Sequence, residues 1–141
     1  MNKKLVFLTL LMLFLLSISC ATLEVHSVEA SGTIYIRSDG SIDPPIAELS
    51  SDDNITYSMT SNLSSSIVIE KDNIVFDGAG YAIQGSGSGN GVELSGRNNV
   101  TIENVEVRGF YQGIMIYNSS RGNNVFGVRA LHNSHGGVLV D

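Results

Sequence analysis

The sequence contains no Trp, one Cys and two Pro among its 141 residues, and aromatic side chains make up only 7% of it. The single cysteine, Cys20, excludes an internal disulfide. Basic residues are also few, since 8 Lys and Arg stand against 14 Asp and Glu and give a net charge of −6. Because binding of a phosphate backbone needs Lys and Arg, this balance argues against nucleic acid as a partner.

The sequence is rich, by contrast, in apolar residues and in residues that favour turns. Hydrophobic residues make up 43% of the chain and Gly occurs 15 times. This composition is too apolar for a disordered chain. Gly and Asn tolerate the positive φ angles that tight turns require, so we expect short strands joined by many turns.

The amino terminus has the pattern of a secretory signal. Lys3-Lys4 precedes the apolar run Leu5–Ile18, which is shorter than the ~20 residues that span a bilayer. We therefore predict a signal peptide over residues 1–30, which forms an N-terminal signal helix and is cleaved after Ala30 or earlier. A secreted or cell-surface protein follows from this prediction.

Cys20 lies near the end of the apolar run and has two interpretations. A lipid-anchor cysteine is one, but Ser17-Ile18-Ser19 before it is a poor lipobox. We favour the other, an ordinary residue that is discarded with the signal peptide.

The remaining chain divides into two zones. Residues 31–66 are predicted to form an N-terminal cap with irregular strands, including a strand at Thr33–Ile36 and a turn at residues 38–41. Residues 67–141 are predicted to carry regular short strands. The first of these are expected at Ile67–Ile69, Ile74–Phe76, Tyr81–Ile83 and Val92–Leu94. After the signal, no stretch has a helical spacing of apolar residues that Gly or Asn leaves uninterrupted.

The second zone contains a repeat. Residues 100–116 align with residues 124–140 at an offset of 24 (137 − 113), and an earlier copy begins at Gly91 with an offset of 22 (113 − 91). Phe76 lies 26 residues (102 − 76) before Ile102, so the period is 22 to 26. The alignment matches Ile102 with Phe126, Val107 with Leu131, Ile114 with Val138 and Ile116 with Val140.

A period of this length with short strands favours a parallel β-helix. Leucine-rich repeats share the length but need a Leu-rich consensus that is missing here. In a β-helix, equivalent strands of successive coils pair about 4.8 Å apart, and alternate side chains point in and out. We predict inner stacks of Val92, Ile114 and Val138 and of Leu94, Ile116 and Val140, an outer stack of Glu93, Met115 and Leu139, and corners at Asn98-Asn99, Asn123-Asn124 and Gly136-Gly137.

Two stretches resemble a known group of proteins. Residues 74–85, IVFDGAGYAIQG, resemble the opening coil of right-handed β-helix proteins of the NosD-like and pectin-lyase-like kind, and residues 32–45 resemble the leader of secreted archaeal members. The resemblance implies an all-β, right-handed parallel β-helix of about three coils over residues 32–141. It implies little about activity, because a fold does not fix a function.

Such proteins carry many more coils than this chain offers. The sequence ends at Asp141, directly after a core strand and without a polar cap. We expect the repeat over 67–141 to be incomplete at its C-terminal end, where further β-helix coils or another copy would cover the open edges.

Carboxylates are the first candidates for chemistry, since related enzymes cluster Asp and Glu on the outside of one sheet. Asp77 is expected near Glu103, and Gly127 is expected at the equivalent position of the next coil. No outer stack therefore offers two acidic side chains flanked by a basic one. Asp77, followed by Gly-Ala-Gly, is better explained as a side chain that orders a turn. We therefore predict no catalytic residue and lean against an enzyme.

Metal ligands are similarly sparse. His132 and His135 lie three residues apart without an evident third ligand, so we interpret them as solvated turn residues. The copper-binding label of NosD-like proteins gets no support from these residues. We predict no cofactor; calcium is conceivable, but no ligand cluster supports it.

Few residues are candidates for ligand binding. Glu93 and Met115 lie on the expected outer face, and Tyr111 and Tyr117, together with Phe110, are candidates for stacking on sugars, although Phe110 suits the core equally well. The N-X-S/T sequence occurs at four candidate glycosylation sites, with chance as the equal alternative: Asn54, Asn62, Asn99 and Asn118.

Three functions are compatible with these observations. The first is a non-catalytic, exported module with a structural role or a binding site for extracellular polysaccharide or cell envelope. The second is a polysaccharide lyase or hydrolase whose acids lie in coils beyond Asp141. The third is a NosD-type accessory protein that handles copper. Stacked acids in further coils would favour the second function, and clustered His and Met would favour the third.

Overall fold

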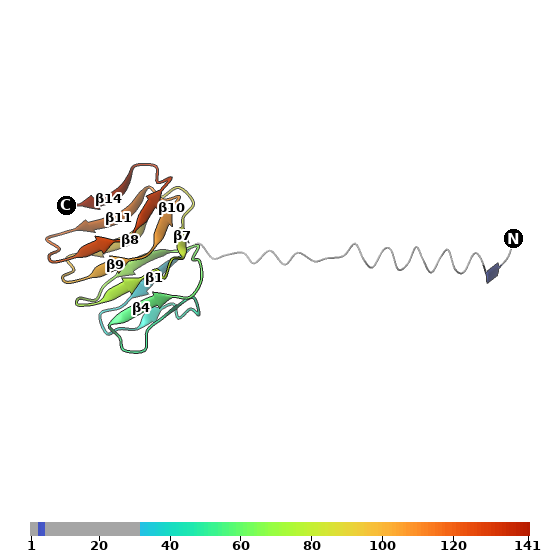
Figure 1. Ribbon diagram of the computed structural model, residues 1–141, viewed down its shortest axis with the longest axis horizontal. Helices are drawn as coiled ribbons and strands as arrows, with labels where there is room; N and C mark the ends of the chain where they lie inside the picture. Colours follow the sequence, from blue (N-terminus) through green and yellow to red (C-terminus); the bar gives the residue numbers. More distant parts are fainter. Residues whose placement is uncertain (1–2, 5–31) are drawn as a thin grey trace.

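The computed structural model describes Lys3–Lys4 and residues 32–141. Most of the predicted signal peptide, with Cys20 and the cleavage after Ala30, lies outside the described residues. In residues 32–141 the chain winds into a parallel β-solenoid of about three turns, as predicted (Figure 1).

Short strands form nearly all of the regular structure. The described residues contain β1 (Thr33–Ile36), β2 (Ile42–Asp43), β3 (Leu49–Ser50), β4 (Thr56–Met59), β5 (Ser66–Ile69), β6 (Val75–Asp77), β7 (Ala82–Gln84), β8 (Asn90–Ser95), β9 (Thr101–Glu103), β10 (Glu106–Arg108), β11 (Gln112–Tyr117), β12 (Asn124–Phe126), β13 (Arg129–Leu131) and β14 (Gly136–Val140).

These strands stack into three sheets. The six-stranded sheet has the order β14-β11-β8-β5-β1-β2, the five-stranded sheet β12-β9-β6-β4-β3, and the three-stranded sheet β13-β10-β7. Neighbouring strands are parallel except at one end, where β2 pairs antiparallel with β1 and β3 with β4. Strands β1 and β4, in the zone predicted as a cap, already pair parallel with β5 and β6.

The core is a set of aliphatic stacks inside the coil. Ile114 pairs with Val92 on one side and Val138 on the other, and Ile116 pairs in the same way with Leu94 and Val140, which confirms the two predicted inner stacks. Ile114 is fully buried. Since each inward residue meets a similar one on the neighbouring rung, the buried apolar core runs from β1 to β11, while Val138 and Val140 of β14 are 46% and 69% exposed.

The register of the short strands differs from the predicted alignment. Ile102 pairs with Val125 and not with Phe126, and Val107 pairs with Ala130 and not with Leu131. The offset in these strands is 23 (125 − 102), while β11 and β14 keep 24 (138 − 114). The extra residue therefore lies in the corner between β13 and β14.

Two further predictions change with this register. Phe126 points outward beside Glu103, where Gly127 was predicted, and its side chain is 54% exposed. Gly136-Gly137 belongs to β14 rather than to a corner.

Left-handed backbone marks the corners of the coil. Asn99, Asn104 and Gly109 have φ angles of 55°, 51° and 72°, and Gly122, Gly127 and His132 follow one coil later with 65°, 62° and 53°. Within each coil these residues are five apart, and a three-residue strand lies between them. Asparagine side chains also connect the coils, as Asn99 Nδ2 donates to Asn73 Oδ1 at 3.0 Å and Asn123 Nδ2 donates to the Arg97 carbonyl at 2.9 Å.

Truncation of the inner stack should destabilise the protein strongly. We expect Ile114→Ala to lower the free energy of unfolding by about 2–5 kcal/mol, because it leaves a cavity between two rungs. Met115→Ala, on the outer side of the same strand, should cost less than about 1 kcal/mol. Urea denaturation of the two variants measures the difference, and equal losses would contradict the inward assignment.

Corner positions should respond to backbone geometry rather than to side-chain volume. Gly109 has φ of 72°, and an added Cβ would lie 2.9 Å from the Gly85 carbonyl oxygen. We expect Gly109→Ala to lower the free energy of unfolding by about 1–2 kcal/mol. As a control, Gly96→Asn should be nearly neutral, since Asn118 already adopts φ of 58° at the equivalent position of the next coil. A neutral Gly109→Ala would show that the corner relaxes easily.

Candidate functional site

The outer face of the six-stranded sheet presents one continuous row of side chains. Register places Tyr35 beside Val68, Val68 beside Glu93, Glu93 beside Met115 and Met115 beside Leu139. We call these five residues the outer row. It runs along the solenoid axis with one side chain per rung, about 4.8 Å apart, and it contains the predicted outer stack.

Glu93 is the best-defined polar group of the outer row. Tyr117 Oη donates to Glu93 Oε1 at 2.7 Å, and Asn90 Nδ2 donates to Glu93 Oε2 at 2.8 Å. Tyr117 comes from the neighbouring strand β11 and pairs with Ser95, so it reaches the carboxylate diagonally. The hydrogen bond to Glu93 raises the pKa of the Tyr117 hydroxyl above its usual value. Glu93 and Tyr117 together form an ordered carboxylate–phenol pair on an open face.

Charged residues flank the other end of the outer row. The Arg37 guanidinium lies 4.0 Å from the centre of the Tyr35 ring and contacts the carboxylates of Glu70, at 3.2 Å, and of Asp43. The sequence analysis did not single out this group, because it rests on contacts between β1, β2 and β5.

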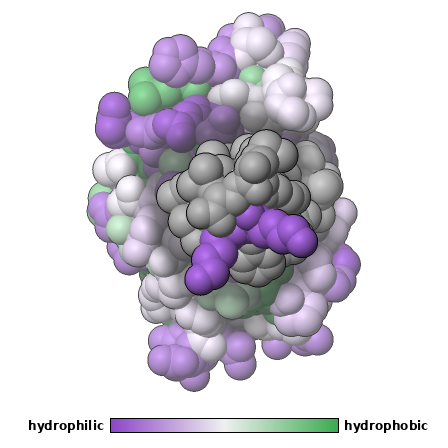
Figure 2. Space-filling model, turned by 90° about the vertical axis from the view of Figure 1, so that its right-hand side faces the viewer, coloured by the Kyte–Doolittle hydropathy of each residue, from purple (hydrophilic) through white to green (hydrophobic). Residues whose placement is uncertain are grey.

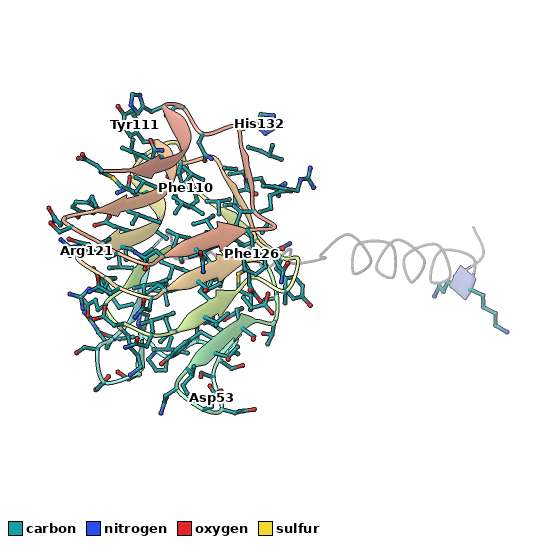
Figure 3. The ribbon with its side chains drawn as sticks, turned by 60° about the vertical axis from the view of Figure 1, so that its left-hand side comes forward. Asp53, Phe110, Tyr111, Arg121, Phe126 and His132 are labelled. Atoms are coloured by element: carbon teal, nitrogen blue, oxygen red, sulfur yellow. The ribbon has the colours of Figure 1, made fainter. Side chains whose placement is uncertain are left out.

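Tyr111 lies apart from this face. It precedes β11, whereas Tyr117 ends that strand, so the two rings do not share one platform. The Tyr111 ring is half exposed and stacks on His135, with centroids 4.7 Å apart and planes within 2°. Phe110 is only 4% exposed and belongs to the core, while Tyr111 lies at the edge of the molecule (Figure 3).

Carboxylates on the five-stranded sheet serve local structure. Asp77 lies beside Glu103, as predicted. Asp77 Oδ1 accepts from the Ala79 N–H at 2.8 Å and from Asn104 Nδ2 at 3.2 Å, which agrees with the turn-ordering role. Asp53 acts similarly, because its carboxylate accepts from two backbone N–H groups, and these bonds lower its pKa.

An ion network on the three-stranded sheet escaped the sequence analysis. Arg108 Nη1 and Arg129 Nη1 lie 2.9 and 3.3 Å from the two oxygens of Glu106. Glu106 and Arg108 lie two residues apart in β10, and the register of β10 with β13 places Arg129 beside Glu106.

Metal and glycan candidates lie on the surface. His132 and His135 are exposed, and no group of three or more His, Cys, Asp or Glu residues suited to a metal occurs in the described part of the chain. Asn54, Asn62, Asn99 and Asn118 are all exposed. The side-chain nitrogen of Asn118 donates to Ser95 Oγ at 2.8 Å, so this sequon sits at the rim of the outer face.

The hollows of the surface are small. One of about 240 Å³ is lined mainly by hydroxyl and amide side chains, including Ser66, Gln84 and Asn90, and one of about 320 Å³ is lined partly by Ile34, Ile46 and Leu63. Figure 2 shows a mostly hydrophilic to neutral surface with scattered hydrophobic spots on the side it views.

Within the described residues there is no helix of the length and hydropathy needed to cross a bilayer.

The Glu93–Tyr117 pair makes a testable prediction about titration. We expect Glu93→Gln to lower the pKa of Tyr117 toward 10, because the hydrogen bond and the negative charge that oppose phenolate formation are lost. In the native protein the pair stabilises the fold at pH values below the usual tyrosine pKa, and this contribution is lost as the pH rises through the raised pKa. NMR titration of the Tyr117 ring carbons measures both effects, and an unchanged pKa in the variant would exclude the contact.

Comparisons with known proteins add no relative to this description. The chain matches no protein-family model, no curated protein and no solved structure. The β-solenoid fold is therefore established by the structure alone, and the NosD-like and pectin-lyase-like resemblance stays a prediction from the sequence.

Proposed function

We propose that this chain is an exported, non-catalytic β-helix module that binds a polysaccharide along the outer face of its six-stranded sheet. The observation that carries the proposal is the outer row with its Glu93–Tyr117 pair. Export is proposed from Lys3-Lys4 and the apolar run Leu5–Ile18.

The chemistry of the outer row suits a sugar chain. Sugar rings present apolar C–H faces and a rim of hydroxyl groups. Val68, Met115 and Leu139 offer aliphatic contact, and the Tyr117 ring offers an aromatic surface with a polar end. Glu93 retains acceptor capacity beyond its two present hydrogen bonds, since a carboxylate has about four lone-pair sites.

The shape of the surface favours an extended ligand over a compact one. Sites for small molecules are usually concave, with volumes of roughly 300–1,000 Å³. The described hollows, at about 240 to 330 Å³, reach only the lower limit of that range. The outer row, in contrast, continues over five rungs and matches a linear polymer in form.

Polysaccharide binding is tested by co-sedimentation of the purified protein with a panel of neutral and acidic polysaccharides. We expect Tyr117→Phe combined with Glu93→Gln to weaken binding about tenfold, which corresponds to the loss of roughly 1.4 kcal/mol from one or two hydrogen bonds.

A matched control lies on another face of the same solenoid. Glu106→Gln also changes a hydrogen-bonded outer carboxylate, but on the three-stranded sheet, so binding should stay within about twofold of the native protein. Native protein that sediments with no polysaccharide, or an equal loss in both variants, would contradict the proposal.

A further inference from the structure

The carboxylate of Glu93 has no basic partner. At the other end of the outer row, Asp43 and Glu70 both contact the Arg37 guanidinium, and on the three-stranded sheet Glu106 contacts two arginines. In the part of the chain that the structure describes, no Lys, Arg or His forms an ion pair with Glu93. The outer row therefore carries a negative charge that the protein itself leaves unbalanced.

The arginines of the same face are held by other groups. Arg97, which follows β8, donates from Nη1 to the Glu70 carbonyl at 3.0 Å and lies 3.8 Å from the carboxylate of Asp72. Arg37 is occupied by the two carboxylates that it contacts. Neither arginine is therefore placed to neutralise Glu93 or to bind an anionic sugar beside it.

Neutral donors hold the Glu93 carboxylate in place and leave part of its capacity unused. Tyr117 Oη donates to one carboxylate oxygen and Asn90 Nδ2 to the other. A carboxylate has about four acceptor sites, so each oxygen can accept one more hydrogen bond. Its neighbours in the outer row, Val68 and Met115, have no polar hydrogen to donate. The remaining acceptor sites are therefore open to a donor from a ligand.

An ammonium group matches this arrangement better than a hydroxyl or a carboxyl group does. It has three donors and a full positive charge, and hydrogen bonds between ionised partners are roughly twice as strong as neutral ones. The Tyr117 ring, held against the carboxylate by its hydroxyl, offers the same cation a second attraction. A uronic acid, in contrast, would bring a like charge toward Glu93 on a chain whose net charge is already −6.

We infer that the ligand of the outer row is a polysaccharide with free amino groups, a polymer of 2-amino sugars, and that Glu93 binds one of its ammonium groups. This inference rests on the proposed function and adds a ligand class to it. A lysine side chain of another protein also carries a primary ammonium group. The apolar residues of the outer row, spread over five rungs, favour the sugar chain, because they can contact the C–H faces of successive rings.

Two forms of one polymer test the inference by co-sedimentation with the exported full chain. Chitosan particles carry free amino groups, and complete N-acetylation of the same particles removes the positive charge while keeping the sugar backbone. At mildly acidic pH and low ionic strength, we expect the native protein to bind the amino form about fivefold more tightly. This preference should shrink as salt is added, because screening weakens a partly exposed ion pair.

A pair of isosteric variants separates Glu93 from the net charge of the chain. Glu93→Gln should bind the two forms within about twofold of each other and retain its affinity for the acetylated form, which also shows that the variant is folded. Glu103→Gln is the matched control. The Glu103 carboxylate likewise has no ion pair within the described residues, but it lies on the five-stranded sheet beside Asp77 and Phe126. This variant should keep the full preference for the amino form.

Four results would overturn the inference. Native protein that binds both forms equally, or prefers the acetylated form, would overturn it and leave polysaccharide binding itself in place. Native protein that binds neither form, nor any neutral or acidic polysaccharide, would overturn the proposed function as well. An equal loss of preference in both variants would show attraction to net charge alone. Tighter binding to polylysine than to the amino form would assign the site to a protein partner.

Discussion

Lateral pairing of each strand with its counterpart one coil away is the constraint on which this molecule depends. In the six-stranded sheet the parallel register runs unbroken from β1 to β14, so an inward residue always has inward neighbours. The corners keep this register through left-handed backbone, as Asn99, Asn104 and Gly109 are matched one coil later by Gly122, Gly127 and His132. Core and outer face are therefore two results of a single pairing rule.

The sequence predicted the six-stranded sheet well and the two smaller sheets less well, for a physical reason. In β11 two inward residues, Ile114 and Ile116, define the register together. A three-residue strand buries only one side chain, and Val125 and Phe126 are both apolar, so hydrophobicity alone does not decide between them. The signal that would have decided is the corner spacing, because Gly122 and Gly127 follow Asn99 and Asn104 at an offset of 23 (122 − 99).

For the candidate site, the sequence predicted which residues lie on the outer face, but it did not predict the hydrogen bonds between their side chains. Alternation along the strands sufficed to place Glu93, Met115 and Leu139 on one outer row. The Glu93–Tyr117 hydrogen bond joins residues that are not register partners and depends on side-chain rotamers. The contacts of Arg37 with Asp43 and Glu70 were not predicted. The reason is that β1 was assigned to an irregular cap, although β1 pairs with β5 in the same parallel way as the later strands.

The antiparallel strands β2 and β3 give the solenoid a direction. An internal coil contacts only the coil before it and the coil after it, and these two contacts are alike. Duplication of one unit of about two dozen residues therefore lengthens the solenoid without disturbing the neighbouring units. The end of the solenoid that β2 and β3 form cannot be extended in this way. Both strands are antiparallel to the strands that they pair with, so no further parallel coil can follow them. Lineages of this architecture should therefore vary in the number of internal coils while the closing hairpins at the first coil stay unique.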